Sequence, residues 1–307
     1  MKSKINKPLF FIGIVACLLP FVSPAIALFM GLLLGFTVGN PYPQQSSKVS
    51  KYLLQFAVVG LGSGMNLHQS LQSGKEGMLF TIVSVIGVLS IGYWLGRKML
   101  LDSKTSYLIS SGTAICGGSA IAAVAPILKA SPNQMSISLG TIFILNAIAL
   151  FIFPPIGRLL QLTQEQFGMW AAIAIHDTSS VVGAGAAYGT KALEVATMVK
   201  LTRALWIIPI SIATTFFFKQ KESKIKIPWF IFFFILAMIA NTVFNLPQNI
   251  TAFIGMLSKK GMTVTLFLIG SGLSIKTLRT VGAKPLILGV TLWIVIGVVS
   301  LGVILFV

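Results

Sequence analysis

Charged residues are scarce in this chain. Only 9% of its 307 residues are charged, whereas 55% are hydrophobic, and soluble domains carry about 25% charged residues. A soluble fold of this length could not bury so much apolar surface. Apolar runs of about 15 to 24 residues alternate with short polar links, which predicts helices that cross a membrane. The alternating pattern of a membrane β-barrel is missing.

Acids, histidines and cysteines are also few. Six acids, two histidines and two cysteines provide neither a disulfide framework nor a zinc cluster. They also offer few residues that could act as the acid or base of a hydrolase. The metalloprotease H-E-x-x-H, the G-x-S-x-G elbow and the Walker A motif are absent. We therefore expect no enzyme, no catalytic residue, no metal site and no cofactor.

Basic residues give a net charge of +17, but they do not form a nucleic-acid surface. They lie between the apolar runs, where they fix topology, and no basic stripe is interleaved with aromatic residues. A cytoplasmic N-terminus places most of them inside, including the clusters GRKMLLDSK and KQKESKIK. This pattern excludes nucleic acid as a partner and predicts an external C-terminus.

The apolar runs predict an all-α polytopic membrane protein with about ten or eleven transmembrane helices in one domain, residues 1–307. The first run resembles a signal peptide with an A-x-A at Ala25–Ala27, but it continues through Phe36 and predicts two short spans that meet at Pro20–Pro24. The predicted spans are 8–22, 24–39, 51–67, 78–96, 105–128, 136–157, 168–189, 197–218, 228–244, 248–274 and 285–306.

Two Gly-Ser-Gly segments resemble each other. GLGSGMNLHQSLQSGKEG (60–77) and LIGSGLSIKTLRTVGAKP (268–285) each lead into a long apolar run. The first Gly-Ser-Gly helix is predicted to run outward and the second inward, which is typical of an inverted-topology repeat. Span 51–67 is short and span 248–274 is interrupted by SKKG, and such broken helices at the membrane midplane mark transporter substrate sites. Chance is the alternative, because glycine and serine are common in membrane helices.

A second pair of segments also matches. CGGSAIAA (116–123) and DTSSVVGA (177–184) share small and hydroxyl residues. The predicted topology makes their two spans parallel, which does not fit an inverted pair. Either one of them is not a full crossing or the match is not a true repeat.

Asp177 is the one acid placed well inside a predicted span. A charge there costs at least about 2.5–3.5 kcal/mol on insertion scales, so the side chain must face a bundle interior or a wet cavity, or be neutral. Its neighbour His176 is the only histidine in a predicted span, and histidine as a residue type titrates near neutrality. We predict that Asp177 and His176 carry the coupling ion, H⁺ or Na⁺. A buried acid with a structural role is the alternative.

Hydroxyl residues and glycines cluster around these positions. A helix break exposes N–H groups, which bind anions together with the helix dipole, although small-residue packing is an alternative. Lys200 and Arg203 share a helix face near the outer end of 197–218 and are predicted to pair with Asp177 or attract an anion; interfacial snorkelling is the alternative. The predicted substrate-binding residues are Thr113, Cys116, Gly117, Gly118, Ser119, His176, Thr178, Ser179, Ser180, Gly62, Ser63, Gly64, Gly270, Ser271 and Gly272.

Four motifs together resemble the YeiH-like sulfate exporter family. They are GNPYPQQSSKVSKYLLQFAVVGLGSGMNL, SSGTAICGGSAIAA, AIHDTSSVVGAGAAYG and ATMVKLTRALWIIP, within a match from about Gly39 to Leu278. The resemblance implies a bacterial inner-membrane protein distantly similar to bile-acid symporters and sodium–proton antiporters. Those folds use inverted repeats, broken crossing helices and a moving core.

We therefore expect a multi-pass inner-membrane transporter of a small inorganic or organic anion, with sulfate or sulfite export as the specific activity, coupled to H⁺ or Na⁺. The expected core elements lie near 51–72, 105–128, 168–190 and 248–275, with the other helices as scaffold. The expected partners are the lipid bilayer, the anion and the coupling ion. The sequence leaves open whether the protein forms a homodimer. A passive anion channel and a membrane-embedded sensor or assembly subunit are the alternatives.

Overall fold

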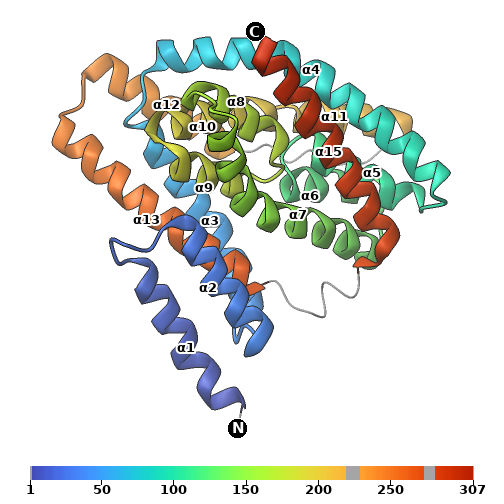
Figure 1. The fold of residues 1–307 in the computed structure, drawn as a ribbon, viewed down its shortest axis with the longest axis horizontal. Coiled ribbons are helices and arrows are strands. Elements are labelled where there is room, and N and C mark those ends of the chain that lie inside the picture. Colours follow the sequence, from blue (N-terminus) through green and yellow to red (C-terminus); the bar gives the residue numbers. More distant parts are fainter. Residues whose placement is uncertain (1, 219–228, 273–280, 307) are drawn as a thin grey trace.

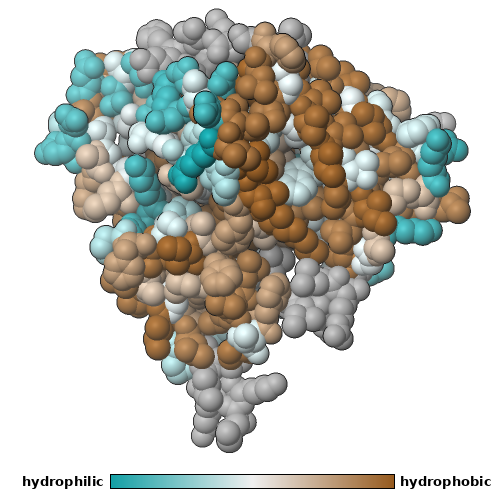
Figure 2. Space-filling model, in the orientation of Figure 1, coloured by the Kyte–Doolittle hydropathy of each residue, from teal (hydrophilic) through white to brown (hydrophobic). Residues whose placement is uncertain are grey.

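The computed structural model describes residues 2–218, 229–272 and 281–306, with side chains outside 2–6 and 68–80. All regular secondary structure in these residues is helical (Figure 1), which confirms the predicted all-α class. Apolar side chains cover the centre and much of the right of the surface seen in Figure 2, while hydrophilic ones gather at its upper left. Apolar surface of this kind suits contact with lipid. Within these described residues, the helical stretches long and apolar enough to cross a membrane are Pro132–Leu159, Thr190–Phe217, Gln248–Gly272 and Ala283–Phe306.

Five helices form one part of the molecule, called the panel here. α13 lies along both α2 and α3, α1 lies beside α2 and α13, and α12 packs on α3 (Figure 1). The pair of N-terminal helices predicted from the proline-rich turn is confirmed. The panel helices are α1 Lys2–Cys17, α2 Pro24–Thr37, α3 Pro43–Gly62, α12 Trp229–Phe244 and α13 Gln248–Gly272.

The predicted interruption of span 248–274 is wrong, because α13 is continuous through SKKG. The small residues of this segment pack against α3: a Cβ on Gly261 would lie 3.4 Å from Leu53, and Ser258 faces Gly60. Small residues let two helices approach closely without breaking either one. The predicted repeat continues beyond Gly272 into 273–280, which lies outside the described residues, as does the KQKESKIK cluster.

The remaining helices surround two helical hairpins. Hairpin A consists of α5 Ser103–Ala114 and α6 Gly118–Ile127. The Lys104 ammonium near its start donates to the Lys129 carbonyl just past its end, at 3.0 Å. Near the turn, Gly112 faces Ile121 across the two arms. The chain therefore reverses at Ile115–Gly117 and returns to the side from which it came.

Hairpin B consists of α8 Gln164–Ala174 and α9 Thr178–Tyr188. The rings of Phe167, near its start, and Tyr188, at its end, stack with centroids 3.8 Å apart. The Tyr188 hydroxyl also donates to the Leu162 carbonyl at 2.6 Å. Spans 105–128 and 168–189 were predicted to cross the membrane, and this prediction is wrong: each segment turns back halfway, where the helix is interrupted.

Helix α7, Pro132–Leu159, joins the bases of the two hairpins. Asp102 at the base of hairpin A accepts from Gln134 near its start, and Arg158 near its end donates to Ala187 of hairpin B. Its 28 residues rise about 42 Å, whereas a 12-residue arm rises about 18 Å. The hairpins therefore enter from opposite sides, and their tips reach the middle of the structure.

Helices α10, Thr190–Ala204, and α11, Ile207–Phe217, return in the opposite direction to α7. They begin at the base of hairpin B and end at the base of hairpin A, where the Tyr107 and Thr214 hydroxyls lie 2.8 Å apart. A hairpin followed by a long helical span thus occurs twice, once as hairpin A with α7 and once as hairpin B with α10 and α11. The two units have opposite orientations, as in inverted-repeat transporters. This arrangement resolves the parallel spans of the predicted topology, because neither hairpin is a crossing. Helices α4 Leu67–Lys98 and α15 Ala283–Phe306 flank the hairpins.

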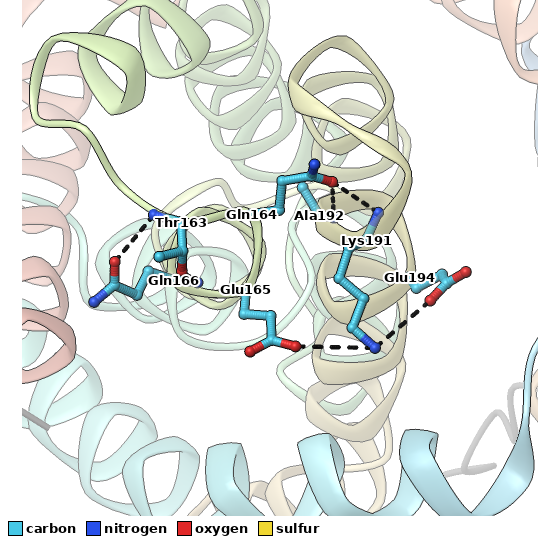
Figure 3. Close-up of polar contacts among 7 residues, drawn as sticks. All are labelled: Thr163, Gln164, Glu165, Gln166, Lys191, Ala192 and Glu194. Atoms are coloured by element: carbon cyan, nitrogen blue, oxygen red, sulfur yellow. Dashed lines mark hydrogen bonds and ion pairs between the residues drawn. The ribbon is translucent and has the colours of Figure 1, made fainter.

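A polar contact at the base of hairpin B fixes where α10 begins (Figure 3). The N-cap residue of α10, Gly189, supplies no side-chain cap. Instead the Gln164 carbonyl oxygen accepts from the backbone N–H of Lys191, at 2.9 Å, and of Ala192. The Lys191 ammonium also lies 4.0 Å from Glu165 and 3.9 Å from Glu194. Exposed ion pairs contribute little, so the capping bonds carry the alignment of α8 with α10.

Substituting Gly270 with alanine should destabilise the panel. A Cβ at Gly270 would lie 2.6 Å from the Leu28 carbonyl oxygen, a backbone atom that cannot rotate away. We expect the free energy of unfolding in detergent to fall by about 1–3 kcal/mol. The matched control is Gly255→Ala in the same helix, where nothing lies within 4 Å; alanine favours a helix, so stability should be unchanged or higher. Equal thermal stability of the two variants would contradict the close crossing of α2 and α13.

Candidate functional site

The tips of the two hairpins touch each other. A Cβ built on Gly117, in the tip of hairpin A, would lie 3.4 Å from Cα and Cβ of Asp177, in the tip of hairpin B. Gly117 also has a φ of 65°, which glycine adopts without steric strain. The Cys-Gly-Gly-Ser and His-Asp-Thr-Ser-Ser segments, far apart in the sequence, therefore form one site.

The tip of hairpin A leaves one helix N-terminus without a side-chain cap. The N-cap residue of α6 is Gly117, which has no side chain to accept from the first turn. Ser119 donates to the carbonyl oxygen of Cys116 at 3.0 Å, while its side chain is exposed and Cys116 is buried. The uncapped N–H groups and the dipole of α6 make this end attractive to an anion.

The tip of hairpin B carries its own acid at the helix start. Asp177 is the N-cap residue of α9, and its carboxylate accepts from the backbone N–H of Ser179 at 3.0 Å and from the Ser179 hydroxyl. The residue is partly exposed, whereas Thr178, Ser179 and Ser180 are buried. His176 is fully buried, and neither ring nitrogen bonds to any described residue. The two neighbours are therefore not joined by a hydrogen bond.

Two buried cations bind the other ends of the interrupted helices. Lys200 donates to the carbonyl oxygens of Ala172, at 3.2 Å in the last turn of α8, and of Ile175, at 2.7 Å, the C-cap residue of the same helix. Arg203 donates to Ile173 at 2.8 Å and also to Ala114, in the last turn of α5. A helix C-terminus carries about half a negative charge. Arg203 therefore joins the two hairpins through their exposed carbonyl groups.

These positions correct two expectations for the cations. Lys200 lies inside the 28-residue candidate span Thr190–Phe217 and is 0% exposed, so interfacial snorkelling is wrong for it. Neither cation forms an ion pair with Asp177, although the structure describes all three side chains. Their hydrogen bonds go to backbone carbonyl groups instead.

Several buried polar atoms around the tips have no partner within the described part of the chain. They are Thr113 Oγ1, Asn146 Nδ2, both ring nitrogens of His176 and Arg203 Nε. A buried polar group without a hydrogen bond costs about 1–3 kcal/mol. Their concentration at one place indicates a site that a polar ligand completes.

Asn146 is the site residue that the sequence prediction missed. Its side-chain oxygen accepts from the backbone N–H of His176 at 3.1 Å and of Asp177 at 3.2 Å. The available signal was a single amide within the apolar run 136–157, which is costly in a membrane unless it has a partner.

With this geometry in place, comparison with known proteins identifies the family. A family model described as "Conserved hypothetical protein 698" matches residues 9–289. The chain belongs to this family. A "UPF0324 membrane protein" of Bacteroides thetaiotaomicron is 62% identical over 289 residues, covering 94% of this chain and 88% of that protein. A protein of the same description from Porphyromonas gingivalis is 54% identical, with 93% and 89% covered.

A third relative, from Shewanella oneidensis, is 43% identical over 301 residues and is also described as a UPF0324 membrane protein. These descriptions make the chain a bacterial multi-pass membrane protein in contact with lipid, and they name no substrate. No solved structure matches.

In this protein the two Gly-Ser-Gly triplets, 62–64 and 270–272, lie at the ends of the panel helices α3 and α13, where their described contacts are those of helix packing. A Cβ on Gly62 would lie 2.8 Å from the Phe234 carbonyl of α12, and Ser63 donates to Gly60 within α3. Gly270 crosses α2, and the Ser271 hydroxyl accepts from Asn40 at 3.0 Å. Gly64 and Gly272 are the last residues of the two triplets. The contacts described for these residues do not include the hairpin tips, so their part in substrate binding stays a prediction.

Within the described residues, no three His, Cys, Asp or Glu side chains gather as a metal site. The groups gathered at the tips are mostly hydrogen-bond donors, together with two cations.

Replacing Arg203 with leucine should unfold or strongly destabilise this UPF0324 protein. The substitution leaves carbonyl groups of both hairpins buried without partners, for which we expect a loss of about 3 kcal/mol or more in the free energy of unfolding. Arg203→Lys should lose less, because one ammonium can still reach one of the two hairpins. Thermal unfolding in detergent measures the effect.

The matched control is Arg158→Leu. Arg158 also donates to a backbone carbonyl, that of Ala187, but at an exposed position. Exposed substitutions usually change stability by about 0.5 kcal/mol or less. Equal stability of Arg203→Leu and Arg158→Leu would show that Arg203 does not hold the hairpins together.

Proposed function

We propose that this protein is a secondary transporter of a small anion, coupled to H⁺ or Na⁺ through Asp177. The observation that carries the proposal is the meeting of two oppositely inserted hairpins at a buried polar site. In membrane transporters, interrupted helices and inverted repeats build substrate sites near the bilayer midplane. Each hairpin separates the site from one side of the membrane, so the two together supply the two gates that alternating access needs.

The balance of charge at the tips favours an anion. Lys200 and Arg203 bring two positive charges, and the C-terminal ends of α5 and α8 about one negative charge together. The N-terminal ends of α6 and α9 bring about one positive charge. With Asp177 ionised, about one positive charge is left uncompensated, and with Asp177 neutralised about two. A small anion completes this balance.

An oxyanion such as sulfate or sulfite is the substrate we favour, in line with the resemblance to sulfate exporters. Its oxygens match the donors present at the tips: the N–H groups at the start of α6, which has no side-chain cap, and the hydroxyl of Thr113. Hydrogen bonds from N–H and O–H groups to an oxyanion are stronger than those between neutral groups.

Asp177 carries the coupling in this proposal. An ionised carboxylate repels a dianion held a few ångströms away, and a bound proton or Na⁺ removes that repulsion. Loading of the coupling ion therefore raises the affinity for the anion, and anion release lowers the affinity for the ion. This reciprocity follows from linkage between two sites.

The substitution Asp177→Asn should abolish coupled transport while preserving the fold. Asparagine is as good an N-cap as aspartate, so the thermal stability should change little, but it cannot take up a proton or bind Na⁺ as a carboxylate does. We expect gradient-driven accumulation of sulfate or sulfite in proteoliposomes to fall by about ten-fold or more.

Asp102→Asn is the matched control, because Asp102 caps α5 by accepting from Thr105 N–H at 2.9 Å and lies outside the tips. Its transport should equal that of the wild type. Unchanged ion-coupled flux in Asp177→Asn would exclude the coupling role, and wild-type flux that ignores proton and sodium gradients would indicate a channel.

A further inference from the structure

Asn146 lies near the middle of α7, on the helix face that contacts the hairpin tips. Ile142, one turn earlier on the same face, would lie 3.2 Å from a Cβ on Gly117 in hairpin A. Asn146 itself accepts from His176 and Asp177 in hairpin B. One face of α7 therefore contacts the point where the two tips meet.

The orientation of the Asn146 amide follows from its two hydrogen bonds. Both partners are backbone N–H donors, and an NH₂ group cannot accept a hydrogen bond. The carbonyl oxygen must therefore point at hairpin B, which places the NH₂ group on the opposite branch of the amide. That group carries two hydrogens, belongs to a residue that is 3% exposed, and has no partner in the described part of the structure.

We propose that Asn146 holds the tip of hairpin B with its oxygen and donates from its NH₂ group to an oxygen of the bound anion. This inference rests on the proposed function and names a further residue of the same site. The unpartnered hydroxyl of Thr113, in the last turn of α5, supplies a second donor. An oxyanion satisfies both groups at once, because each of its oxygens can accept more than one hydrogen bond.

The same amide links the anion to the coupling residue. Its oxygen bonds to the backbone N–H of Asp177, and its NH₂ group meets the anion. A shift of the amide when the anion binds therefore changes how the tip of hairpin B is held. Asn146 thus acts as a positioning residue for Asp177 as well as a ligand-binding one.

Two substitutions separate the binding role from the holding role. Asn146→Asp keeps an oxygen that can accept from both backbone N–H groups but removes the NH₂ group. Asn146→Ser also removes the NH₂ group, holds the tip less well, and adds no charge. Only Asn146→Asp adds a charge and only Asn146→Ser loosens the tip, so the missing donor is the one change that the two variants share, and it predicts weaker anion binding in both.

The measurement is stabilisation of the purified full-length protein by sulfate and by sulfite, followed by uptake of the same anions into proteoliposomes. A ligand that binds the folded state raises its stability by mass action. We expect both variants to raise the apparent Kd by about ten-fold or more relative to wild type. Without anion, Asn146→Asp should melt within a few degrees of wild type.

Asn133→Asp and Asn133→Ser are the matched controls. Asn133 is an exposed asparagine in the first turn of the same helix, so these variants introduce the same chemical changes into α7 away from the tips. Their apparent Kd values should equal the wild-type value.

Three results would overturn the inference. Wild-type affinity in Asn146→Asp with weaker binding only in Asn146→Ser would assign Asn146 to holding the tip alone. If neither variant can be recovered in folded form, Asn146 would likewise be assigned to holding the tip alone. If sulfate and sulfite neither stabilise the wild type nor are transported by it, the oxyanion of the proposed function fails, and the ligand role of Asn146 fails with it.

Discussion

The absence of water inside a bilayer is the constraint on which this structure depends. Every helix end placed there must find partners for its backbone groups, and two hairpin tips place four such ends together. Arg203 and Lys200 satisfy the carbonyl ends, and Asp177 caps one N-terminal end. The remaining N-terminal end, at α6, has no side-chain cap. The protein thus provides hydrogen-bond donors for the negative C-terminal ends of α5 and α8. It leaves the positive N-terminal end of α6 without a side-chain cap, and that end attracts negative charge.

The rest of the hairpin region serves to bring these groups together. Helix α7 spans the distance between the two hairpin bases, and α10 returns beside α8, aligned by the Gln164 cap at its start. That alignment places Lys200 opposite the last turn of α8 and Arg203 between the hairpins. The panel touches this region through α9, where Gly183 packs against Leu266 of α13. A site built from two oppositely inserted hairpins is therefore held by full-length helices on either side.

Much of the site could be predicted because its chemistry is local in the sequence. An acid, a histidine and a run of hydroxyls in an apolar segment indicate function wherever the segment lies. The hairpins could not be predicted, since a 25-residue apolar stretch with a central break is equally consistent with a crossing and with a reversal. The direction taken after the break depends on contacts such as Phe167 with Tyr188, which join residues about twenty positions apart. The Gly-Ser-Gly triplets are ambiguous for a related reason: in a membrane helix, glycine is typical both of close contact with a ligand and of close helix crossing.

The sequence by itself determined the membrane class, the helical content, the N-terminal helix pair and the identity of the polar segments, because composition and hydropathy act on each segment separately. Only the tertiary structure decided that the Cys-Gly-Gly-Ser and His-Asp-Thr-Ser-Ser segments are opposed hairpin tips. It alone placed Asn146 against the tip of hairpin B and turned Lys200 and Arg203 toward backbone carbonyl groups. Each of these contacts depends on a side chain and an unsatisfied backbone group lying within hydrogen-bonding distance of each other. Those distances are fixed only when the helices pack.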